Sequence, residues 1–125
     1  MSTLAEQMAE DTLEAQKFSR KHLVVDLAMS ASSVAELEEN VDMVEFAIAG
    51  GKSEENVDLL TRIWGAFLGQ ALIQVAGGSW IEKEGRPAVQ GANGIAFPHD
   101  RVRRRITDGS ENNLSTYFAE MIEQL

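Results

Sequence analysis

The sequence predicts a single α+β domain of 125 residues, in which helices pack on a small antiparallel sheet. Three observations favour this fold class. Apolar residues recur at helical spacing near both ends of the chain, short β-prone segments lie around Trp80, Val89 and Ile95, and glycine-containing turns separate those segments. We expect the element order helix, strand, helix, helix, three strands, helix, helix (α-β-α-α-β-β-β-α-α).

The first elements are predicted from periodicity. Apolar residues between Leu4 and Phe18 share one face, which indicates an amphipathic helix over residues 3–20. Residues 22–28 (HLVVDLA) are short, alternating and rich in β-branched side chains, so we expect a strand there.

The second and third helices are predicted from their caps. Ser33 precedes Glu36 by three residues, a capping box that indicates the start of the second helix, and Gly50-Gly51 indicates its end. Ser53 should cap the third helix, residues 54–76, which is apolar on more than one face and therefore central.

The charge-free stretch from Ile63 to Ile81 approaches the length of a membrane span. It contains glutamines and the break Gly77-Gly78-Ser79, which favour a buried core helix. The three β-prone segments that follow are expected to form an antiparallel meander, because turn signals stand at Glu84-Gly85 and at residues 91–94. Pro98 should end the last strand; a short helix up to Gly109 and a final helix over residues 111–124 complete the prediction.

Composition restricts the functional classes. The chain has no cysteine, which excludes disulfides and thiolate metal sites, and its N-terminus lacks the pattern of an export signal, so we expect a cytoplasmic protein. The net charge of −9 lies entirely in residues 1–60, which hold 13 acids and 4 bases, whereas residues 61–125 hold 7 of each. This asymmetry disfavours nucleic acid and membranes as partners and favours a cationic protein.

No catalytic pattern is complete. Gly50-Gly51-Lys52-Ser53 resembles the end of a phosphate-binding loop, but Phe46 occupies the first glycine position and no strand is expected before it. His22 and His99 each have an aspartate nearby yet lack a third ligand or a nucleophile. We therefore expect neither an enzyme nor a metal or cofactor site.

Arg101, Arg103, Arg104 and Arg105 cluster in this acidic chain, and two interpretations remain open. The arginines either pair with acids such as Asp100, Asp108 or those of the second helix, or form an anion site with Thr107.

Four groups of residues follow one another in the second half of the chain. They are Gly65-Ala66-Phe67-Leu68-Gly69-Gln70, Gly77-Gly78-Ser79-Trp80, Ala96-Phe97-Pro98 with Val102-Arg103-Arg104-Arg105-Ile106-Thr107-Asp108-Gly109, and Asn112-Asn113-Leu114 with Tyr117-Phe118. As a series they resemble a family of small bacterial domains of unknown function with the pattern G-A-Y-L-G-E, G-G-x-W, P-x-x-x-V-x-K-R-I-x-N-G. The likeness covers roughly residues 22–120.

The resemblance implies a protein related to immunity proteins encoded beside secreted bacterial toxins. Gln70 stands where the family pattern has Glu, so any role that needs a carboxylate there is in doubt. Physically, Gly65 and Gly69 share a helix face and predict a close approach to another element, with Trp80 filling space beside it.

The predicted second helix offers a candidate binding face. A helical wheel of residues 34–48 places an apolar stripe toward the core, whereas Met43 and Phe46 point the other way among carboxylates. Apolar anchors inside an acidic rim are typical of a hot spot for a basic partner. The alternative is that the first helix covers Met43 and Phe46. The expected partner-binding residues are Glu36, Glu38, Glu39, Asp42, Met43, Glu45, Phe46, Glu54, Glu55 and Asp58.

These observations lead to a functional hypothesis. We expect an immunity or antitoxin protein whose acidic surface blocks a secreted antibacterial effector. Two alternatives stay open: an acidic adaptor or effector-export chaperone, and a small-ligand-binding domain. The sequence does not predict the oligomeric state.

Overall fold

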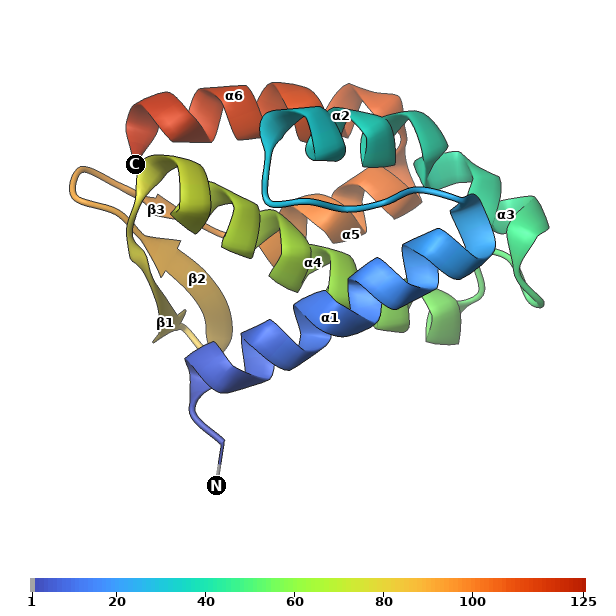
Figure 1. The fold of residues 1–125 in the computed structure, drawn as a ribbon, viewed down its shortest axis with the longest axis horizontal. Coiled ribbons are helices and arrows are strands. Elements are labelled where there is room, and N and C mark those ends of the chain that lie inside the picture. Colours follow the sequence, from blue (N-terminus) through green and yellow to red (C-terminus); the bar gives the residue numbers. More distant parts are fainter. Residues whose placement is uncertain (1) are drawn as a thin grey trace.

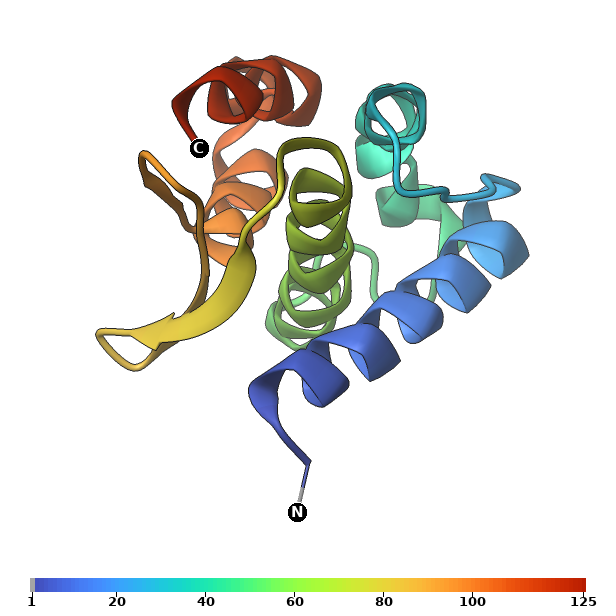
Figure 2. The same ribbon diagram turned by 60° about the vertical axis from the view of Figure 1, so that its left-hand side comes forward.

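Helix α4 (Glu54–Ala76) runs through the middle of the molecule, and the other elements surround it (Figures 1 and 2). The computed structural model describes residues 2–125. The hydroxyl of Ser53 caps α4 by accepting the backbone N–H of Asn56 at 3.3 Å, and Gly77 ends the helix with a φ of 83°. The prediction of a Ser-capped central core helix is therefore confirmed, with the same bounds.

Helices cover α4 on several sides. Helix α1 (Leu4–Leu23) and helix α5 (Pro98–Asp108) both pack directly on it, and α6 (Leu114–Gln124) lies beside α2 (Ala31–Asn40). Figure 2 looks nearly along α4 and shows the sheet and α5 on one side, with α1 and α2 on the other. The part of the chain that the structure describes contains five helices of ten residues or more and a three-stranded antiparallel sheet. The α+β class is confirmed.

The expected strand over residues 22–28 is wrong. Helix α1 continues to Leu23, and the irregular segment after it, which starts with Val24 at a φ of 56°, pairs with no strand among the described residues. Val25 and Leu27 are buried while Val24, Asp26 and Ala28 are exposed. The alternation in the sequence therefore indicates alternate burial but not membership of a sheet. The side chains of Gln16 and Ser33 bind the backbone of this segment, at the carbonyl of Leu27 (2.8 Å) and the N–H of Ala28 (2.8 Å). These bonds replace part of what a neighbouring strand would supply.

The predicted cap and continuity of the second helix are also corrected. Ser30, not Ser33, caps α2, and its hydroxyl accepts the N–H of Ser33 at 3.3 Å. The helix is interrupted by a 3₁₀ turn, η1 (Val41–Met43), before a short α3 (Val44–Ala47). A serine three residues before a glutamate fits a capping box, but here Ser33 is buried and bonded to the preceding extended segment.

The sheet is the meander that the turn signals predict. Strands β1 (Ser79–Lys83), β2 (Arg86–Gln90) and β3 (Ile95–Ala96) pair antiparallel in chain order. Trp80 lies opposite Val89, and Val89 lies opposite Ala96. After α5 ends before Gly109, a 3₁₀ turn η2 (Ser110–Asn112) precedes α6, which Asn113 caps; the final helix therefore begins later than residue 111.

The motif glycines of α4 provide space for two rings. A Cβ on Gly69 would lie 2.1 Å from the Trp80 indole, and a Cβ on Gly65 would lie 2.4 Å from the His99 imidazole. The two rings contact each other edge to face, with centroids 5.9 Å apart. The indole N–H of Trp80 donates to the side-chain oxygen of Gln70. The predicted close approach is confirmed, and these motif residues form a packing unit between α4, β1 and α5.

Helix α4 is the one helix among the described residues that is long and apolar enough to cross a membrane by length and composition. More than half of its most apolar window, 56%, is buried inside the fold. Its aromatic residues Trp64 and Phe67 lie in the hydrophobic core.

Candidate partner-binding face

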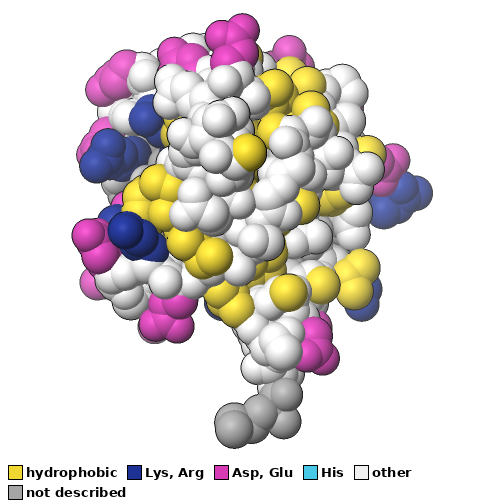
Figure 3. All heavy atoms as spheres, turned by 90° about the vertical axis from the view of Figure 1, so that its left-hand side faces the viewer, with side chains coloured by type: hydrophobic (Ala, Val, Ile, Leu, Met, Phe, Trp, Pro, Cys, Tyr) yellow, Lys and Arg dark blue, Asp and Glu magenta, His cyan; other side chains and the backbone are white. Residues whose placement is uncertain are grey.

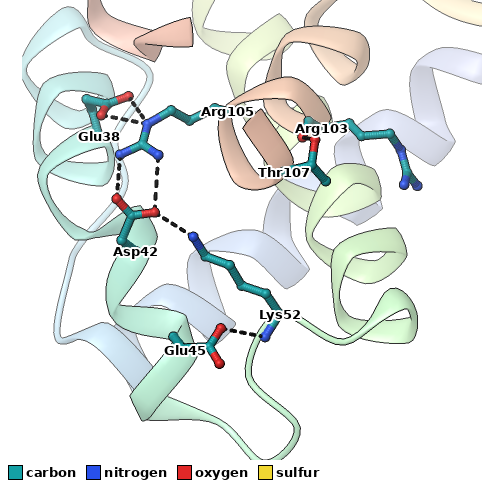
Figure 4. Close-up of polar contacts among 7 residues, drawn as sticks. All are labelled: Glu38, Asp42, Glu45, Lys52, Arg103, Arg105 and Thr107. Atoms are coloured by element: carbon teal, nitrogen blue, oxygen red, sulfur yellow. Dashed lines mark hydrogen bonds and ion pairs between the residues drawn. The ribbon is translucent and has the colours of Figure 1, made fainter. Parts of the chain in front are cut away.

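A buried arginine joins α5 to α2. The Arg105 side chain is only 4% exposed, and its Nε donates to both carboxylate oxygens of Glu38, at 3.0 and 2.8 Å. Its two terminal nitrogens donate to Asp42, at 3.2 and 3.0 Å (Figure 4). One guanidinium thus uses two carboxylates one helical turn apart, a geometry that lysine cannot provide.

Glu38 is therefore not a surface carboxylate. Besides the two bonds from Arg105, it accepts the backbone N–H of Leu114 at 2.7 Å, the first residue of α6. The expectation that Glu38 is exposed for a partner is wrong. The helical wheel places Glu38 at the edge of the core stripe, and the element that covers this edge is 67 residues away in sequence.

Asp42 and Glu45 are held by the loop that leads into α4. The Lys52 ammonium lies 2.7 Å from Asp42, and the Lys52 backbone N–H donates to Glu45 at 3.2 Å (Figure 4). Hydrogen bonds from Arg105, and then from Lys52, lower the pKa of Asp42 to about 2. Asp42 is consequently ionised at neutral pH, and its side chain remains 59% exposed.

An outward stripe runs along α2, η1 and α3. We give this name to Glu36, Glu39, Met43 and Phe46, which follow one another at intervals of three, four and three residues. Their spacing matches one face of a helix. Met43 is 51% exposed and Phe46 is 84% exposed. The opposite face, Val34, Leu37, Val41 and Val44, is buried in the core.

This geometry decides between the two readings of Met43 and Phe46. Helix α1 contacts α3 but does not cover the Phe46 ring. A shallow pocket of about 340 Å³ lies at the other end of the stripe, lined by Ser32, Ser33, Ala35, Glu36 and Glu39. The stripe thus combines an acidic hollow at one end with an exposed aromatic ring at the other.

The remaining predicted residues lie at the start of α4. Glu54 and Glu55 are exposed in its first turn, and Asp58 forms an ion pair with Arg103 of α5. In the described part of the chain, Glu36, Glu39, Glu54 and Glu55 take part in no ion pair. These four uncompensated carboxylates make the face electronegative.

The arginine cluster divides over the faces of α5. Arg105 points to α2 and Arg103 to Asp58 of α4, as structural pairing predicts. Arg101 lies over the Tyr117 ring of α6, with its guanidinium carbon 4.7 Å from the ring centroid. Thr107 donates to the carbonyl of Arg103 at 2.8 Å, and it makes no hydrogen bond to an arginine guanidinium in the described residues. Structural pairing therefore accounts for Arg103 and Arg105, and in the described residues Thr107 does not join the guanidiniums.

A second surface feature lies over the sheet. Figure 3 faces the sheet and the end of α6, and it shows a band of hydrophobic side chains with Lys and Arg side chains close to one flank. Trp80, Ile81, Pro87 and Ile95 are all partly exposed in these strands. By the strand register, Trp80 and Pro87 lie on one face of the sheet and Ile81 and Ile95 on the other, so these four residues do not form a single patch.

The described residues contain no group of three or more acidic or histidine side chains arranged to hold a metal ion. No family model, curated protein or solved structure matches the chain. The site must therefore be interpreted from its own geometry.

Proposed function

We propose that this chain is a protein-binding domain that captures a cationic protein through the outward stripe. In this proposal it acts in the cytoplasm as an immunity protein that blocks a secreted antibacterial toxin. The observation that carries the proposal is Phe46, an aromatic ring that is 84% exposed on a helix whose other face is fully buried. Aromatic residues, phenylalanine among them, are enriched in the buried centre of protein–protein interfaces.

The energetics of the stripe favour a partner with a pocket and a basic rim. Full burial of a phenylalanine side chain is worth about 1.5–3 kcal/mol, and Met43 adds a flexible apolar neighbour. The carboxylates of Glu36 and Glu39 contribute mainly by steering a cationic protein, which accelerates association. A toxin whose substrate-binding surface is cationic and contains an apolar pocket has both features that the stripe requires.

In this proposal only the motif series of the second half of the chain, which no family model matches, favours inhibition over simple capture. An adaptor or chaperone would use the same stripe but would leave the activity of its partner intact. The first test is to express the product of the adjacent gene in a bacterial host, with and without this chain. Restored growth, together with loss of the toxin's activity in a purified mixture, is the expected result. A tight complex that stays toxic would establish the adaptor reading.

The second test locates the interface. In kinetics with the purified partner, Phe46→Ala should raise the dissociation rate about 30-fold, equivalent to about 2 kcal/mol, because the anchor is lost. Leu13→Ala is the matched control, since Leu13 is an exposed apolar residue on α1. Its dissociation rate should stay at the wild-type value. Equal effects of the two changes would remove Phe46 from the interface.

The charges are tested separately. The double change Glu36→Lys with Glu39→Lys should slow association about tenfold at low salt and flatten its salt dependence. The control is Glu10→Lys. Glu10 is exposed on α1, so this change alters the net charge of the protein without changing the stripe. If two such reversals on α1 slow association as strongly, the steering comes from net charge and not from this face.

A further inference from the structure

Two arginines of α5 have no acidic partner in the part of the chain that the structure describes. Arg104 is exposed and makes no hydrogen bond or ion pair, and Arg101 has only a long bond of 3.4 Å to the side-chain oxygen of Asn112. They stand three residues apart, on one side of the helix. In a chain with a net charge of −9, two adjacent guanidiniums without a carboxylate partner require an explanation.

Both arginines line the same pocket. It has a volume of about 240 Å³ and lies between β3, the beginning of α5 and α6. Ile95, Phe97 and Met121 supply apolar walls, and the ring of Tyr117 supports Arg101 through a cation–π contact of 4.7 Å. The pocket therefore combines positive charge with apolar surface, and both occur together in small-molecule sites.

Asp100 is the one acidic residue among those that line the pocket, and it is already neutralised. Its carboxylate forms an ion pair with Arg86, whose guanidinium carbon lies 4.3 Å from the centroid of the Phe97 ring. The pocket consequently keeps an excess of positive charge. Asp100 still disfavours a doubly charged ligand more than a singly charged one, since its repulsion scales with ligand charge.

We propose that this pocket binds a small organic monocarboxylate, with the carboxylate held by Arg101 and Arg104 and an apolar body against Ile95 and Met121. Guanidiniums bind carboxylates in a planar, bidentate manner, which suits a single anionic group. The volume lies just below the range of drug-sized sites, so the ligand has roughly ten non-hydrogen atoms. For a molecule of that size we expect a dissociation constant on the order of 0.1–1 mM.

This site is separate from the outward stripe. The pocket is formed by β3, α5 and α6, whereas the stripe belongs to α2, η1 and α3. On α5 itself, Arg105 points toward α2 while Arg101 contacts α6. Failure of one proposal therefore leaves the other intact.

The test is a titration of the isotope-labelled full chain followed by amide NMR shifts, with phenylacetate as the probe. Its comparators are 2-phenylethanol, which has a similar apolar body without charge, acetate, and inorganic phosphate. We expect saturable shifts at residues of β3, α5 and α6 with phenylacetate. Each comparator should bind at least tenfold more weakly. No saturation by 10 mM phenylacetate, or equal binding of any comparator, would overturn the assignment.

Variants place the site on α5. Arg104→Gln should weaken phenylacetate binding at least tenfold while leaving the melting temperature unchanged, because the exposed Arg104 makes no hydrogen bond or ion pair among the described residues. Arg103→Gln is the matched control on another face of the same helix, and its affinity should remain within twofold of wild type. Equal losses in the two variants, or no loss in Arg104→Gln, would show that the pocket does not hold the carboxylate. A peptide with a C-terminal phenylalanine that binds more than tenfold tighter than phenylacetate would also overturn the small-molecule assignment.

Discussion

The buried bond between Arg105 and Glu38 makes a sharp prediction about stability. Glu38→Gln keeps the shape of the side chain but removes its charge. Arg105 is 4% exposed and would then depend on Asp42, whose side chain is 59% exposed. Removing one partner of a buried ion pair costs about 3–5 kcal/mol, and the surviving Asp42 bonds place this case at the lower end, about 3 kcal/mol. An unfolding entropy of about 2.1 cal/mol/K per residue makes this a fall of roughly 11 °C in melting temperature.

The assay is urea denaturation followed by tryptophan fluorescence, with Glu39→Gln as the control. Glu39 is the next residue, is exposed and takes part in no ion pair among the described residues, so its change should stay within about 0.5 kcal/mol. A double change, Glu38→Leu with Arg105→Met, should be less destabilising than the sum of its single changes, because neither charge is left unpaired. A loss below about 1 kcal/mol in Glu38→Gln, or strict additivity in the double change, would refute the reasoning.

Two further predictions concern the packing unit and pH. Gly69→Val should destabilise the fold by about 1–3 kcal/mol, since its Cβ would meet the Trp80 indole at 2.1 Å; melting curves in a Trp80→Ala background should show a smaller penalty, and an equal one would contradict the contact. Burial lowers the pKa of His99 to about 4. The unfolded chain therefore binds the His99 proton more tightly than the folded one, and the free energy of unfolding falls by about 3 kcal/mol at most as pH drops from 6.5 to 4. Urea midpoints should show that His99→Gln removes this loss whereas His22→Gln does not. The lowered pKa of Asp42 affects stability at lower pH. The contribution of Asp42 to folding stability is fully present above pH 3.8 and is lost as pH falls through about 2. A His99→Gln protein with the wild-type pH slope would rule the His99 prediction out.

Local signals predicted most of the fold. The hydroxyl of Ser53 followed by a long apolar helix, the glycine turns of the meander and Gly109 after α5 each act within a few residues. Such features are decided by neighbours in the sequence, and the structure agrees with them. The charge asymmetry could also be read from the sequence, and helical periodicity placed Met43 and Phe46 on the side away from the core stripe. Whether the first helix covered them was decided by the structure, in which both side chains are exposed.

Long-range partners decided what local patterns could not. Residues 22–28 alternate like a strand. Whether such a segment joins a sheet depends on whether a sheet edge lies beside it, and here side chains of α1 and α2 bind its backbone instead. Glu38 and its exposed neighbour Glu39 are both glutamates of the same predicted helix, and residue type alone does not show which of them is buried. Glu38 becomes a buried acceptor because Arg105, 67 residues away, and the backbone N–H of Leu114, 76 residues away, both bind it.

The sequence by itself therefore determined the fold class, the central helix, the acidic half and the side of the second helix that bears Met43 and Phe46. The exposure of those two side chains was decided by the tertiary structure. Tertiary structure decided which charges are free to act on a partner. Glu38 forms a buried ion pair with Arg105, whereas Glu36 and Glu39 take part in no ion pair among the described residues. It also separated the arginines of α5, turning Arg105 inward and leaving Arg101 and Arg104 on a pocket. The physical reason is that periodicity fixes the direction of a side chain, while its charge state, burial and partners depend on what other elements bring to the same place.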